Sequence, residues 1–74
     1  MSGYFVPKEY LFEQTVAADI WVIDHACGFP SVDVFINENG KVEKMIPFAV
    51  KFISKSRCEI HFTRPFAGIA KLVG

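Results

Sequence analysis

Apolar and polar residues alternate along most of the chain with a period of two, which is typical of half-buried β-strands. No window of twelve residues carries a convincing helical stripe. Turn-forming residues interrupt the alternation at intervals of about 8–12 residues, as in small all-β folds. The pattern predicts short strands over residues 9–15, 19–25, 31–37, 41–47, 48–54, 58–64 and 68–73.

These segments indicate a single all-β domain over residues 9–74. We expect a small six- to seven-stranded antiparallel β-sandwich or barrel. Residues 1–8 are predicted to form an N-terminal arm, because Tyr4, Phe5 and Val6 are apolar but precede a proline without a strand of their own. A free apolar arm lowers solubility, so we expect the arm to dock on a neighbouring molecule.

The strand faces also predict the register of the first hairpin. A two-residue turn at residues 39–40 would pair Ile36 with Glu43, whereas a three-residue loop over residues 38–40 pairs Ile36 with Val42. A slip of one residue exchanges the two faces of a strand. Because it pairs two apolar residues, Ile36 and Val42, we expect the three-residue loop, with Gly40 in a left-handed backbone conformation that forms a bulge.

The next hairpin is predicted by the same reasoning. A loop over residues 55–57 would pair Val50 with Phe62 and Phe52 with Ile60. This register again places apolar residues of both strands on one face.

Composition and charge limit the classes of partner. The 74 residues are 51% apolar, and a chain this short buries only about 60% of its unfolded surface, so assembly would add stability. Eight basic and eight acidic residues cancel, and no basic stripe interleaves with the aromatics, which argues against nucleic acid. Apolar runs reach only about six residues, and no secretory signal is visible, so we expect no membrane partner.

One short stretch carries the residue types of nucleophilic catalysis and metal binding, at Asp24, His25 and Cys27. In a strand, however, His25 shares a face with Trp21 and Ile23, while Asp24 points to the other face. The alternation therefore disfavours an Asp–His dyad. We interpret His25 as a histidine at the margin of the core, hydrogen-bonded to nearby backbone and stabilising the turn that follows.

The two cysteines are expected to be reduced thiols without a catalytic role. Cys27 has no predicted helix and no sequence-adjacent cation to lower its pKa, and Cys58 alternates with core residues. A zinc site of both cysteines with His25 and His61 would lack close ligand pairs, and alternation separates His61 from Cys58. We therefore expect no enzyme, no metal and no cofactor; a thiol or metal centre at His25 and Cys27 is the least favoured hypothesis.

Two apolar residues fall on faces that should point outward. Phe35 shares a face with Asp33 and Asn37, and Ile69 shares one with Lys71. An exposed aromatic beside such polar residues could also stack on a sugar ring. The interface candidates are Tyr4, Phe5, Val6, Phe35 and Ile69.

A longer pattern extends over residues 12–73: W-x-I-x-H, then G, then P-x-V-x-V, an Asn-Gly hairpin, a V-x-I-x-F strand with Cys58 in place of its valine, a proline-containing turn and a G-x-A-x-L end. The matching residues are Trp21, Ile23, His25, Gly28, Pro30, Val32, Val34, Asn39, Gly40, Cys58, Ile60, Phe62, Pro65, Gly68, Ala70 and Leu72. This order resembles a short all-β module of bacteriophage tail fibres, tail tips and other virion structural proteins. The positions that the resemblance and the turn chemistry mark as structural are Trp21, His25, Gly28, Pro30, Gly40 and Gly68.

The resemblance implies a structural protein of a phage virion, in the tail, the neck or the capsid surface. It implies assembly in the host cytoplasm, contacts with other virion proteins and a homo-oligomer, with a trimer favoured. The alternative is a receptor- or glycan-binding module of a tail fibre.

Overall fold

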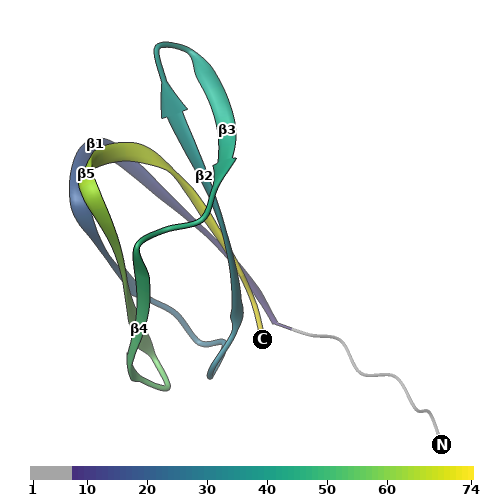
Figure 1. The fold of residues 1–74 in the computed structure, drawn as a ribbon. Coiled ribbons are helices and arrows are strands. Elements are labelled where there is room, and N and C mark those ends of the chain that lie inside the picture. The colour runs from purple at the N-terminus through teal and green to yellow at the C-terminus, as the bar shows by residue number, and fades with distance from the viewer. Residues whose placement is uncertain (1–7) are drawn as a thin grey trace, which may run out of the picture.

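The computed structural model describes residues 8–74, which form one open antiparallel sheet of five strands (Figure 1). The strands are β1 (Glu9–Asp24), β2 (Ser31–Glu38), β3 (Lys41–Met45), β4 (Ala49–Ser54) and β5 (Arg57–Val73). The all-β prediction is confirmed, although the strands number five rather than six to seven and the sheet does not close into a barrel. The part of the chain that the structure describes contains no helix able to cross a membrane.

β5 is the centre of the fold and is paired along both of its edges. β1 runs along one edge for nearly its whole length. The other edge is shared, because β4 pairs with residues 57–61 and β2 pairs with residues 67–73. The predicted strands 9–15 and 19–25 are the two halves of β1, and the predicted strands 58–64 and 68–73 are the two halves of β5. The structure therefore has fewer strands than predicted.

β1 and β5 bend together near their middles, as Figure 1 shows. The register of β1 on β5 is irregular between Gln14 and Ala18 and again between Ala18 and Ile20. Such bulges bend a strand and increase its twist. They also change which positions point inward, from Phe12 before the bend to Trp21 after it. The two halves of the sheet therefore face one another across a shared core.

The core draws on both halves of the folded sheet. Its buried members are Trp21, Ile23, Val34, Ile36, Cys58, Ile60, Phe62, Phe66, Ala70 and Leu72. The rings of Trp21 and Phe62 lie 4.8 Å apart between centroids, and those of Phe62 and Phe66 lie 5.4 Å apart. Phe12 reaches Trp21 across the bend, with 6.1 Å between ring centroids. Aromatic packing of this kind stabilises the folded sheet beyond the area it buries.

The predicted register of the β2–β3 hairpin is wrong. Ile36 pairs with Glu43 across a two-residue turn, in which Asn39 has φ 54° and Gly40 has φ 78°. Two positive φ angles match the type I′ turn, whose twist agrees with that of the flanking strands. Pairing Ile36 with Val42 would bury little apolar surface, because β3 lies at the sheet edge and Val42 is 62% exposed. The turn therefore determines the register.

The predicted register of the β4–β5 hairpin is wrong by two residues, although its faces are right. Val50 pairs with Ile60 and Phe52 with Cys58. The loop is shorter than predicted, because Ser54 already pairs with Arg57 after an irregularity in β4.

Candidate functional site

The Asp24–Cys27 stretch forms the end of β1 and the turn that follows. His25 is 7% exposed, and its Nδ1 accepts a hydrogen bond from the backbone N–H of Cys27 at 3.1 Å. Its own backbone N–H donates to the carbonyl oxygen of Ser56 at 2.9 Å. The first bond lies within the 25–30 turn, and the second joins this turn to the β4–β5 hairpin. The Nε2 atom of His25 is buried and has no hydrogen-bond partner among the described residues.

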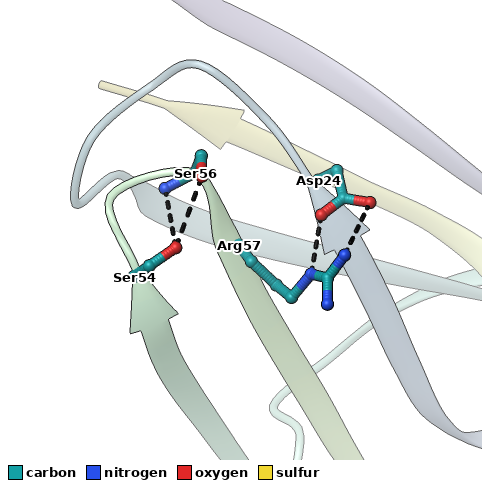
Figure 2. A network of polar contacts seen from close by, with 4 residues as sticks. All are labelled: Asp24, Ser54, Ser56 and Arg57. Carbon is teal, nitrogen blue, oxygen red and sulfur yellow. Dashed lines mark hydrogen bonds and ion pairs between the residues drawn. The ribbon is translucent and has the colours of Figure 1, made fainter.

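Asp24 points away from His25 and interacts with the neighbouring strand. Figure 2 shows its carboxylate beside the guanidinium of Arg57, with Nε donating to Oδ1 at 2.7 Å. The hydrogen bond from Arg57 holds the pKa of Asp24 below its ordinary value. The structure thus places the Asp24 carboxylate on Arg57 and not on His25, and no Asp–His dyad forms in this stretch.

Cys27 lies near Cys58, but His61 does not join them and the described thiols and imidazoles form no common site. Cys58 is fully buried, and burial raises the pKa of its thiol, which disfavours the reactive thiolate. His61 lies on the opposite face of β5, where its Nε2 is 3.0 Å from Oε1 of Glu59. Within residues 8–74, no group of three or more His, Cys, Asp or Glu side chains is arranged to hold a metal ion.

The predicted structural glycines occupy constrained positions. Gly28 adopts φ 70°, in the left-handed region that favours glycine, and the following Pro30 is buried. Gly68 lies where β2 approaches β5, and a Cβ atom there would overlap the backbone carbonyl of Phe35. Close pairing of these two strands therefore requires a glycine at position 68.

Two of the predicted interface residues meet on the outer face of the sheet. Phe35 and Ile69 are cross-strand partners, and both are partly buried. Together with Glu13 and Asn37 they line a shallow hollow of about 210 Å³. Asp33, which is predicted to share a face with Phe35, forms an ion pair with Lys44 of β3. The other candidates, Tyr4, Phe5 and Val6, lie outside the described residues.

A second hollow, of about 310 Å³, opens where β3 ends and β5 bends. Its lining residues are Met45, Ile46, Phe48, Phe62, Thr63, Arg64 and Phe66. Ile46 is 92% exposed and Phe48 is 76% exposed, which makes this link the most exposed apolar segment among the described residues. Sequence reasoning missed it by assigning both residues to strands; the intervening proline was the one signal that the chain leaves the sheet there.

The outermost strands leave their backbone groups unpaired. Within the described residues, β1 pairs with β5 alone, so its other edge is free along 16 residues. The outer edges of β3 and β4 are free as well. Large apolar side chains of β1 are exposed, with Leu11 at 65% and Val16 at 72%. A long free edge that carries exposed apolar residues is a template for pairing with another chain.

Comparison of the chain with known proteins finds no counterpart. No protein-family model, no curated protein and no solved structure matches it. Any function must therefore be argued from the sequence and from the geometry described above.

Proposed function

We propose that this domain is an assembly module, a structural protein of a bacteriophage virion in the tail, the neck or the capsid surface. It acts through protein–protein contacts in the assembled particle, and it forms a homo-oligomer with a trimer as the leading stoichiometry. The observation that carries the proposal is the free edge of β1, together with the exposed apolar residues of the described chain.

An open sheet exposes edge strands whose backbone groups can pair with another chain. Soluble monomers protect their edge strands by keeping them short, charged or covered. β1 is 16 residues long, and Val16, Ile20 and Val22 are each more than 40% exposed. A partner strand would satisfy the edge and bury these side chains, and strands from a neighbouring copy would complete the sandwich or barrel that the alternation predicts.

The virion assignment is supported by the residue pattern from Trp21 to Leu72, which resembles the phage structural module. Many of these residues lie in the core or in turns of the structure, which are positions that maintain a fold. In this proposal, the protein assembles in the host cytoplasm and ends up in the particle.

The test is the molar mass of the purified full chain in solution, together with its affinity for phage tail, neck and capsid proteins from the same source. We expect a stable oligomer by light scattering and sedimentation, and binding to at least one of those proteins. A folded monomer that binds none of them would overturn the proposal.

A glycan-binding module is the second candidate, favoured by the hollow at Phe35. A partly buried aromatic lies there beside Glu13 and Asn37, whose polar groups suit sugar hydroxyls. Calorimetric titration with host surface polysaccharide should then show binding that Phe35→Ala abolishes. An absence of heat with the parent protein would eliminate this candidate.

A further inference from the structure

We propose that copies of this chain associate head to tail, with the β1 edge of one copy docked on the β3–β4 edge of the next. The acidic edge is defined as β1, residues 9–24, and the basic edge as residues 41–55. The proposal rests on the self-association proposed above and adds to it the two surfaces that meet.

The two edges lie on opposite sides of the same central strand. Residues 20–24 of β1 and residues 49–54 of β4 pair with opposite edges of β5, both over its first half. One copy therefore offers both surfaces at the same time. A contact between two different surfaces is heterologous, and it forms a closed ring when its rotation closes, as a trimer would require.

The charges of the two edges are complementary. The acidic edge carries four carboxylates, Glu9, Glu13, Asp19 and Asp24, and neither Lys nor Arg. The basic edge carries four lysines, Lys41, Lys44, Lys51 and Lys55, and a single acid, Glu43. Internal ion pairs engage Glu9, Asp24 and Lys44. Within residues 8–74, the structure places no ion-pair partner on Glu13, Asp19, Lys41, Lys51 or Lys55.

This charge pattern selects among the ways in which two copies could pair. Pairing β1 with β1 would set carboxylates against carboxylates, and pairing two basic edges would set lysines against lysines. Like charges opposed across strands are destabilising, whereas opposite charges favour the contact and steer the encounter. Only the acidic edge on the basic edge brings opposite signs together.

The exposed apolar side chains favour the same pairing of the two edges as the charges do. Val16 lies between the two parts of the β1 register that flank the bend, and it is 72% exposed. Beside the bend of β5, within the basic edge, the hollow of about 310 Å³ presents Ile46 and Phe48. That volume corresponds to about ten waters at about 30 Å³ each, so it can admit a valine side chain. Docking Val16 there would remove three exposed apolar side chains from water.

Charge reversal in the full chain tests the contact. Asp19→Lys and Lys51→Glu change exposed residues outside the core, and each should weaken self-association about fivefold at low ionic strength. High salt should reduce that difference. The double variant should associate more weakly than either single variant, because it lowers the charge of both edges. Sedimentation at a series of concentrations measures each dissociation constant, and circular dichroism checks folding.

Apolar variants test the hollow independently of charge. Phe48→Ser and Val16→Ser should weaken association at both low and high salt. Ala26→Ser is the control: Ala26 is exposed in the 25–30 turn, outside both edges, so this variant should associate as the parent does.

The outcomes separate this inference from the proposed function. If the parent chain associates and Asp19→Lys leaves the affinity unchanged or tightens it, as relief of β1–β1 repulsion would, the head-to-tail contact is wrong while assembly stands. The same conclusion follows if Phe48→Ser has no effect. A parent chain that stays monomeric yet binds a virion protein removes the head-to-tail contact and the homo-oligomer, and leaves only the assembly role with other virion proteins. A monomer that binds no virion protein removes both.

Discussion

Trp21 joins the two bends of the sheet through a single nitrogen atom. Its Nε1–H lies 3.0 Å from the carbonyl oxygen of Phe66 in β5 and 3.1 Å from that of Ala18 in β1. Both carbonyls belong to the segments where the strands bend. The same indole packs on Phe62, so one side chain supplies both hydrogen bonds and aromatic packing at the bend.

Trp21→Phe should therefore lower the free energy of unfolding by about 1–3 kcal/mol. Phenylalanine keeps much of the apolar volume but leaves the Phe66 carbonyl, which lies in a buried setting, without its donor. Urea unfolding followed by circular dichroism measures the change, since the variant has no other tryptophan to report it. Phe29→Leu, at an exposed ring, is the control; equal losses in the two variants would show that the indole bond contributes nothing.

Acid sensitivity is the second residue-scale prediction. Hydrogen bonds from Arg57 and Arg64 hold the pKa of Asp24 and of Glu38 below their ordinary values of 3.8 and 4.5. Because these pKa values are lower in the folded chain, the stabilisation is present above the ordinary values and is lost as the pH falls through the folded ones. Both carboxylates are exposed, so the effect is small.

Replacing both acids, by Asp24→Asn with Glu38→Gln, should flatten the dependence of unfolding free energy on pH below about 4.5. Urea midpoints measured from neutral pH to about pH 2 give the comparison. Asp33→Asn serves as control, since Asp33 pairs with a lysine at 3.3 Å rather than with an arginine. A double variant as acid-sensitive as the parent would contradict this assignment.

At the scale of elements, the alternation of apolar and polar residues correctly predicts which side chains share a face of a strand. It does not predict which strands pair or in which register. It places His25 with Trp21, and Phe35 opposite Val34, because each strand's period of two is local information. It cannot show that β1 and β5 continue through their bends, because that depends on pairing between residues far apart in sequence. The hollow at Ile46 and Phe48 was missed for the same reason: neither residue pairs with β5, and only the long-range fold determines this.

The β2–β3 turn supplies the element-scale prediction. Gly40 has φ 78° and no atom within 4 Å of an added Cβ, so Gly40→Ala is penalised by backbone strain alone. We expect a loss of about 1 kcal/mol or somewhat more, measured by urea unfolding with Trp21 fluorescence. Asn39→Gly should change stability by less than about 0.5 kcal/mol, because glycine tolerates φ 54°. If Gly40→Ala were neutral, the turn would not have the type I′ geometry.

At the scale of the whole molecule, β5, with which β1, β2 and β4 all pair, follows the other four described strands along the chain. Glu9 pairs with Val73, and the backbone N–H of Gly74 donates to the carbonyl of Lys8 at 2.7 Å. Among the described strands, only the β2–β3 and β4–β5 hairpins are local. Chains dominated by such long-range pairing fold slowly, because loop closure must precede the contacts that stabilise it.

Folding and assembly should accordingly occur in a fixed order. After dilution from urea, we expect the fluorescence of Trp21, which is fully buried in the native sheet, to change over milliseconds to seconds. Light scattering should rise only afterwards, because β4 is held in place by β5, the strand that also carries β1, and both edges are needed for a head-to-tail contact. The Phe48→Ser variant should keep the fluorescence phase and lose most of the scattering rise. Scattering that precedes the fluorescence change would instead indicate association of unfolded chains, and it would contradict assembly through preformed edges.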